Sequence, residues 1–170
     1  MRFKINEIGD DGLTLDVAIT SEWLAEACPD LDAHPGPRGL KLRGRLSQSG
    51  EDYLLQARIA GSLEAPCARC LEPARFAVDA PMTVTFVSAD EGEDLGDDAD
   101  VVGFAGNVID LRDETRDEIL LAIPLKPLCK EDCRGLCAVC GGNRNATLCD
   151  CEERARQAAS RFAAIGNLKI

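Results

Sequence analysis

Aromatic and histidine side chains are scarce in this chain. Only 4% of the 170 residues are aromatic and there is one histidine, His34, whereas 45% of the residues are hydrophobic. The core is therefore expected to be built from aliphatic side chains. His34 lies in the segment His34-Pro35-Gly36-Pro37. We expect this segment to be a loop and His34 a surface residue, remote from any metal site.

The sequence motifs of common catalytic sites are absent as well. The chain contains no G-x-S-x-G, no H-E-x-x-H and no glycine-rich phosphate-binding loop. Those motifs place a nucleophile, a catalytic zinc ion or a nucleotide phosphate. Their absence favours a non-catalytic binding or assembly factor over an enzyme, and it predicts no small-molecule substrate.

Long hydrophobic runs are missing too. No segment approaches the roughly 20 apolar residues of a membrane span, and the first residues, Met1–Glu7, lack the apolar stretch of a signal peptide. We therefore expect a cytoplasmic protein that does not contact a membrane. In that compartment cysteine thiols stay reduced and are available to bind metal.

Positive charge is in short supply overall, but it is unevenly distributed. The net charge is −11, so the chain should not coat nucleic acid non-specifically. Seven acidic residues and no basic residue lie between Asp90 and Asp100, which predicts a solvated loop. From Arg38 to Arg75, seven basic residues face four acidic ones, so this region is mildly basic.

Alternating apolar and polar residues predict β-strands through roughly the first 110 residues. Met1–Ile8 and Leu13–Ile19 flank the turn Gly9-Asp10-Asp11-Gly12, which fits a strand pair. Leu40–Leu46 alternates apolar residues with Lys41, Arg43 and Arg45 and predicts a half-buried strand with a cationic outer face. Further strands are expected at Tyr53–Leu63, Arg75–Val78, Met82–Val87 and Val101–Ile109.

Helices are expected after Ser21, from Asp110 to about Ile123, and from Cys151 to Ile165. The predicted fold class is α+β: a mainly antiparallel β-sheet with a few helices and a C-terminal zinc-thiolate module. We expect two domains. Residues 1–124 would form the sheet domain with an acidic loop at 88–100, and residues 125–170 the cysteine-rich metal-binding module with a terminal helix.

Cysteine, in contrast, is abundant, with nine residues. Six lie between Cys129 and Cys151 in the order C-x3-C-x3-C-x2-C-x8-C-x-C, and Cys67 and Cys70 form an earlier C-x2-C pair. Thiolates at such short spacings can converge on one tetrahedral ion, whereas these spacings are poor for a disulfide within each pair. The ninth cysteine, Cys28, is expected to be a small buried hydrophobic residue.

Two groupings of the eight clustered cysteines fit their spacing. In the first, one zinc ion is held by Cys137, Cys140, Cys149 and Cys151, and a second site is built from Cys67, Cys70, Cys129 and Cys133. In the alternative, Cys129, Cys133, Cys137 and Cys140 form one site. Spacing alone does not choose between them, so one or two zinc ions per chain are expected.

Four thiolates close the coordination shell of zinc and leave no position for water or substrate. The expected metal is therefore structural. An iron–sulfur cluster is an alternative because it uses the same ligands. A redox-active pair at Cys67 and Cys70 is a weaker alternative, since the βαβ context of thioredoxin-like motifs is missing.

Several segments of the chain resemble one bacterial family. They are Pro66-Cys67-Ala68-Arg69-Cys70-Leu71-Glu72-Pro73, the helical segment Asp117–Pro124 and the tail Arg161–Leu168. Together they resemble the YceD family, the "large ribosomal RNA subunit accumulation protein" family. The cysteine run Leu128–Asn145 is similar to the C-terminus that a subset of its members carries. Arg144 departs from the family pattern, which usually has leucine between the two asparagines.

The resemblance implies a role in the accumulation of 23S rRNA and in large-subunit biogenesis. The implied partner is 23S rRNA or a large-subunit precursor, with a ribosomal protein as a further candidate. Six cations near the predicted strand and the cysteines are candidate RNA-binding residues: Lys41, Arg43, Arg45, Arg69, Arg134 and Arg144. Ordinary solvated surface charges are an equal alternative for them. A second hypothesis for the function is a protein-interaction adaptor whose acidic loop engages a basic partner.

Overall fold

The computed structural model describes residues 1–89 and 100–163. The acidic residues 90–99 of the predicted loop and the tail 164–170 lie outside the described residues. The chain forms two compact units, the first of Met1–Ala65 and Arg75–Pro127, the second of Pro66–Ala74 and Leu128–Ile170. The sequence-based division at residue 124 assigned Pro66–Ala74 to the sheet, whereas here this segment belongs to the second unit.

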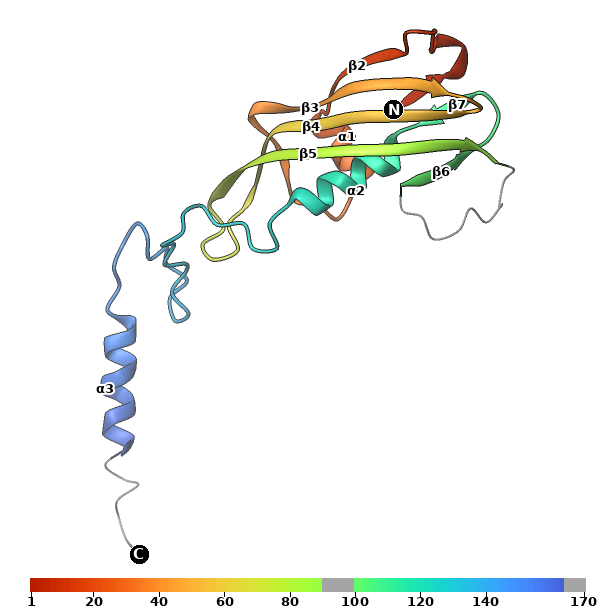
Figure 1. Ribbon diagram of the computed structural model, residues 1–170. Helices are drawn as coiled ribbons and strands as arrows, with labels where there is room; N and C mark the ends of the chain where they lie inside the picture. Colours follow the sequence, from red (N-terminus) through yellow and green to blue (C-terminus); the bar gives the residue numbers. More distant parts are fainter. Residues whose placement is uncertain (90–99, 164–170) are drawn as a thin grey trace, which may run out of the picture. The chain divides into compact units, whose positions relative to one another are not determined.

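The first unit contains most of the regular elements (Figure 1). In chain order they are β1 (Arg2–Lys4), the short 3-10 helix η1 (Ile5–Glu7), β2 (Leu13–Ala18), α1 (Ser21–Ala27), β3 (His34–Ser49), β4 (Asp52–Pro66), β5 (Pro73–Ser88), β6 (Val101–Phe104), β7 (Val108–Asp110) and α2 (Arg112–Ala122). The last residue of β4 and the first two of β5 already belong to the second unit. The second unit also holds α3 (Cys151–Ala163).

The strands form a five-stranded sheet in the order β2-β3-β4-β5-β6 and a two-stranded sheet of β1 and β7. The pairs β2–β3, β3–β4 and β1–β7 are antiparallel, and β5–β6 is parallel. The predicted α+β class with mainly antiparallel strands is therefore confirmed.

Four local expectations were wrong. The separate strands expected at Arg75–Val78 and Met82–Val87 are one continuous strand, β5. β1 pairs with β7, not with β2, because a turn between two alternating segments does not fix their partners. The expected strand Val101–Ile109 is two strands, interrupted next to Gly106, whose φ of 73° is a turn conformation. The segment His34–Pro37 is the beginning of β3 and not a loop.

The core lies between the inner face of the sheet and the two helices α1 and α2. Leu42 and Leu46 of β3 are fully buried, as are Ile59 of β4 and Ile119 of α2. The polar residues that alternate with the leucines of β3 remain exposed, so the predicted half-buried strand is confirmed. Helix α1 begins one residue earlier than expected, since the hydroxyl of Thr20 accepts the N-terminal hydrogen bond from the Trp23 backbone N–H at 3.2 Å.

None of the helices in the described ranges combines the length and the apolar character that crossing a membrane requires.

Candidate metal centres

The second unit brings eight cysteines together as two groups of four, which we call the first and the second tetrad. The first tetrad is Cys67, Cys70, Cys129 and Cys133, and the second is Cys137, Cys140, Cys149 and Cys151. Within each tetrad the four sulfur atoms lie within 4.8 Å of one another, so each could hold one metal ion. This is the first of the two groupings that the spacing allowed.

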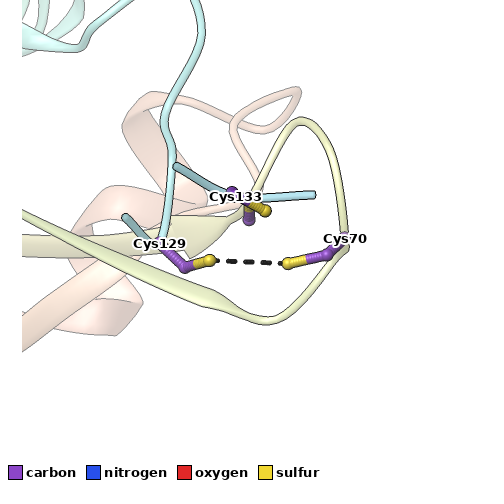
Figure 2. Close-up of side chains that lie close together, drawn as sticks. Cys70, Cys129 and Cys133 are labelled. Atoms are coloured by element: carbon purple, nitrogen blue, oxygen red, sulfur yellow. Dashed lines mark hydrogen bonds between the residues drawn. The ribbon is translucent and has the colours of Figure 1, made fainter. Parts of the chain in front are cut away.

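The first tetrad joins the turn between β4 and β5 to the segment that follows Pro127 (Figure 2). The Sγ atoms of Cys70 and Cys129 are 3.5 Å apart, and those of Cys67 and Cys133 are 3.8 Å apart. Four thiolates at about 2.3 Å from a tetrahedral zinc ion would be separated by about 3.8 Å. The sulfurs are thus unbonded to one another and spaced as metal ligands.

The two C-x2-C pairs form the same kind of turn, here called a knuckle. In the first knuckle the backbone N–H of Cys67 donates to the carbonyl of Glu72 at 2.8 Å, and the N–H of Leu71 donates to the carbonyl of Cys67 at 3.0 Å. The N–H of Arg69 also donates to the Cys67 sulfur at 3.5 Å. The turn therefore places two thiols on one side and directs a backbone donor at one of them.

The second knuckle repeats this pattern with Cys137 as its first cysteine. The N–H of Cys137 donates to Gly142, the N–H of Gly141 donates to Cys137, and the N–H of Val139 approaches the Cys137 sulfur at 3.4 Å. Gly141 has a φ of 71°, and Leu71 takes the same conformation at the equivalent place with a φ of 64°. Glycine adopts this conformation freely, whereas leucine is strained in it. The glycine after the second knuckle is thus explained by its backbone angle.

Within each tetrad the thiols differ in how readily they ionise. Burial opposes ionisation of Cys67, but hydrogen bonds from the backbone N–H groups of Cys129, Arg69 and Cys70 outweigh it and lower the pKa of Cys67 to about 6. Backbone hydrogen bonds from Cys140 and Val139 likewise lower the pKa of Cys137 to about 6. Burial also opposes ionisation of Cys133, but hydrogen bonds from the Asn145 amide and the Gly135 backbone outweigh it and lower its pKa. At least one thiol per tetrad is therefore ready to bind a cation as thiolate near neutral pH.

Two other thiols, those of Cys129 and Cys151, ionise less readily. Burial and then contact with the Cys70 thiol raise the pKa of Cys129 to about 12. Contact with the Cys140 thiol, followed by burial, raises the pKa of Cys151 to about 12. Crowded sulfurs resist a second negative charge, and a bound dication would remove that penalty because it favours the thiolate form.

A side-chain amide supports the first tetrad from outside. The Nδ2 group of Asn145 donates to the Cys133 sulfur at 3.3 Å and to Oδ1 of Asn143 at 2.9 Å, while its Oδ1 accepts from the Arg134 backbone N–H at 2.9 Å. The guanidinium of Arg69 donates to the Cys133 carbonyl at 2.8 Å. Sequence analysis missed the role of Asn145, although its place in the cysteine run was a signal for it.

The six cations proposed for RNA binding fall into two groups. Lys41, Arg43 and Arg45 lie exposed on the outer face of β3 in the first unit, where Lys41 and Arg43 both lie 3.4 Å from Asp16. In the part of the chain that the structure describes, Arg45 has no ionic partner. Sequence analysis missed Arg58 of β4, which lies directly opposite Arg43 and pairs with Asp79.

The other three cations belong to the second unit, and two of them are engaged there. Arg69 binds the Cys133 carbonyl, and Arg144 forms an ion pair with Glu152 at 2.8 Å. Arg134 is exposed, and its side chain has no ionic partner within residues 1–89 and 100–157.

Comparison with known proteins gives one family. The family model described as "Large ribosomal RNA subunit accumulation protein YceD" matches residues 55–169. An uncharacterised protein of Mycobacterium bovis is 35% identical over 103 residues, which is 60% of this chain and 50% of that protein. "Large ribosomal RNA subunit accumulation protein YCED homolog 1, chloroplastic" of Zea mays is 42% identical over 57 residues, 33% of this chain and 20% of that one. The chain thus spans about half the length of the mycobacterial relatives it matches. No solved structure matches it.

Proposed function

Because this chain belongs to the YceD family of large ribosomal RNA subunit accumulation proteins, we propose that it supports accumulation of 23S rRNA during assembly of the large ribosomal subunit. In this proposal it acts in the cytoplasm as a non-catalytic factor that binds the rRNA or a precursor particle. The family description and the name of the maize homologue support the role in rRNA accumulation.

Direct RNA binding is assigned to the outer face of the five-stranded sheet, and one observation carries this assignment. Arg43 of β3 and Arg58 of β4 lie directly opposite each other across the strand pair. Like charges in that position destabilise a sheet. Their partners Asp16 and Asp79 are about half exposed or more, and such surface ion pairs contribute at most about 1 kcal/mol. RNA phosphates could therefore replace these carboxylates at little cost.

Lys41 and Arg45 extend this face along β3. The register places Lys41, Arg43 and Arg45 opposite Ala60, Arg58 and Gln56, respectively. The four cations follow two neighbouring strands on one side of the sheet, and Asp16 and Asp79 are the acidic residues that pair with three of them. A row of cations on an open sheet matches the spaced phosphates of an RNA backbone.

The metal is proposed to be zinc, with one ion in each tetrad. Four sulfurs per site, the sulfur separations of 3.5 and 3.8 Å in the first tetrad and the backbone donors at Cys67 and Cys137 support this choice. A closed thiolate shell gives zinc a structural role. Metal analysis of the purified chain should find two zinc ions. Iron, with absorbance in the visible range, would instead establish the iron–sulfur alternative.

Charge reversal tests the RNA surface. Arg43→Glu and Arg45→Glu should each weaken binding to 23S rRNA fragments and reduce the dependence of log Kd on log salt concentration by about one unit per lost phosphate contact. Lys126→Glu is the matched control, since Lys126 is exposed in the same unit but not on this face. Affinity unchanged by both reversals, or lowered equally by the control, would remove the sheet face from the proposal.

A further inference from the structure

A groove of about 500 Å³ lies in the first unit beside β5, β6 and α2. Its apolar lining includes Met82 and Val84 of β5, whose side chains are almost completely buried, and Leu121 of α2, which is 80% exposed. Its acidic lining includes Glu114, Asp117 and Glu118 of α2. The groove thus combines an apolar floor with carboxylates, and among the described residues no lysine, arginine or histidine lines it.

Two carboxyl groups of the groove, those of Glu114 and Glu118, have no ionic partner among the described residues. Asp117 pairs with Arg116 at 2.9 Å. Glu118 has no ionic partner in the described part of the chain, and there Oε2 of Glu114 is buried without accepting a hydrogen bond. Burial, and then the neighbouring acids Asp113 and Asp110, raise the pKa of Glu114. A cation that entered the groove would relieve this excess of negative charge.

The apolar lining narrows the choice of cation. A hydrated metal ion gains nothing from Met82, Val84 and Leu121, whereas lysine and arginine carry long aliphatic stems that pack on apolar surface while the charged end reaches a carboxylate. Nucleic acid is disfavoured here, since its phosphates would meet carboxylates without a counterion.

We propose that this groove is a docking site for a lysine- or arginine-rich segment of a partner protein. The stems of the basic side chains pack on Leu121, Met82 and Val84, and their charged groups bind Glu118. The site is lined by α2 and β5 and does not include the cations of the outer sheet face. The docking proposal therefore does not depend on the proposed RNA binding. A basic protein and an RNA could then occupy the chain together.

A labelled peptide of alternating lysine and leucine, with blocked ends, is a suitable probe, and fluorescence anisotropy at about 0.15 M salt measures its affinity. Glu118→Lys and Leu121→Ser should each weaken binding about tenfold, because one removes an attractive charge and the other an apolar wall. The matched controls are Glu51→Lys, exposed in the turn between β3 and β4, and Leu125→Ser, fully exposed after α2. Both controls should bind within about twofold of the unchanged protein.

Five results would overturn the proposal, and the last of them needs an additional variant. The first is an unchanged affinity for the lysine–leucine peptide in both groove variants, and the second is an equal loss of affinity in Glu51→Lys. The third is equal binding of a glutamate–leucine peptide. The fourth is a dimer of this chain that Leu121→Ser dissociates, because the groove would then be an interface between two copies. A further variant, in which the acidic residues between 90 and 98 are replaced by the corresponding amides, tests whether the peptide binds the acidic segment. Loss of binding in that variant together with retention in Glu118→Lys would assign the peptide to the acidic segment instead.

Discussion

Replacing Asn145 by aspartate should weaken metal binding at the first tetrad and leave the second tetrad unchanged. Asn145 donates through Nδ2 to the Cys133 sulfur at 3.3 Å and to Asn143 at 2.9 Å. Aspartate has the same shape but no donor, so both hydrogen bonds are lost and a carboxylate oxygen faces a thiolate. The Arg134 backbone N–H can still donate to the remaining oxygen, as it does to Oδ1 now. The change therefore targets the sulfur contact.

Loss of such an outer ligand contact lowers metal affinity about 10- to 100-fold, which corresponds to about 1.4 to 2.7 kcal/mol. The first tetrad can be measured alone in a background with Cys140→Ser and Cys149→Ser, and the second alone with Cys70→Ser and Cys129→Ser. Zinc affinity follows from competition with a chromophoric chelator. Asn6→Asp is the control, since Asn6 is exposed and makes no side-chain hydrogen bond within the described residues.

The outcome separates two roles for Asn145. If Asn145→Asp keeps the zinc affinity of the first tetrad within about twofold, the amide does not stabilise the bound thiolate, and the reasoning from the 3.3 Å contact is refuted. If both tetrads weaken equally, Asn145 acts on the folding of the whole second unit and not on one site. Only a loss confined to the first tetrad agrees with the geometry.

Further predictions concern backbone, charge and metal. Gly141→Ala should lower the free energy of unfolding by about 1 kcal/mol in urea, because φ is 71° while the space for a methyl group is open; Gly9→Ala, also in open space, should not. Gly44→Ala should cost about 2 kcal/mol or more by the same measurement, because its Cβ would come within 2.5 Å of Ala57. Burial opposes ionisation of Asp110, but Arg2 and the N-terminal ammonium outweigh it and lower its pKa. The resulting stabilisation is present above the unfolded pKa of about 4 and is lost as pH falls through the lower folded value. Asp110→Asn should therefore cost about 1 kcal/mol near neutral pH and almost nothing near about pH 2 in pH-dependent unfolding. Zinc added to metal-free protein should fill the second tetrad first, as followed by thiolate absorbance in the two serine backgrounds. That site closes within the short segment Cys137–Cys151, whereas the first tetrad joins Cys70 to Cys129, 59 residues later in the chain.

The sequence was informative where a local pattern controls the structure. The alternation in Leu40–Leu46 predicted which side chains of β3 are buried, because successive residues of a strand point to opposite faces. The C-x2-C spacing at Cys137 and Cys140 predicted that their thiols converge, and the turn that brings them together is formed by neighbouring residues. In both cases the determining contacts lie within a few residues.

Local patterns could not predict which segments come together when they lie far apart in the sequence. Nothing in Arg2–Lys4 indicates that β1 pairs with β7, and nothing in the alternation of Val101–Phe104 indicates a parallel pairing with β5. The same limit applied to the cysteines. Spacing allowed two groupings, and only the positions of the sulfurs in space show which four come together. Arg58 was missed because its importance depends on the register with Arg43.

The placement of the cations also ranks the two units as RNA-binding surfaces. A closed shell of four thiolates gives a metal no free position for a phosphate, so the tetrads can contribute to RNA binding only through the side chains that they position. In the second unit Arg69 is engaged by the Cys133 carbonyl and Arg144 by Glu152, which leaves Arg134. On the sheet, Arg45 has no ionic partner among the described residues, whereas the exposed Arg43 and Arg58 oppose each other and pair with the exposed Asp16 and Asp79. Each unit thus keeps one of these cations without an ionic partner among the described residues, Arg45 on the sheet and Arg134 in the second unit. The proposed assignment of RNA binding to the sheet therefore depends on its row of four cations on two neighbouring strands.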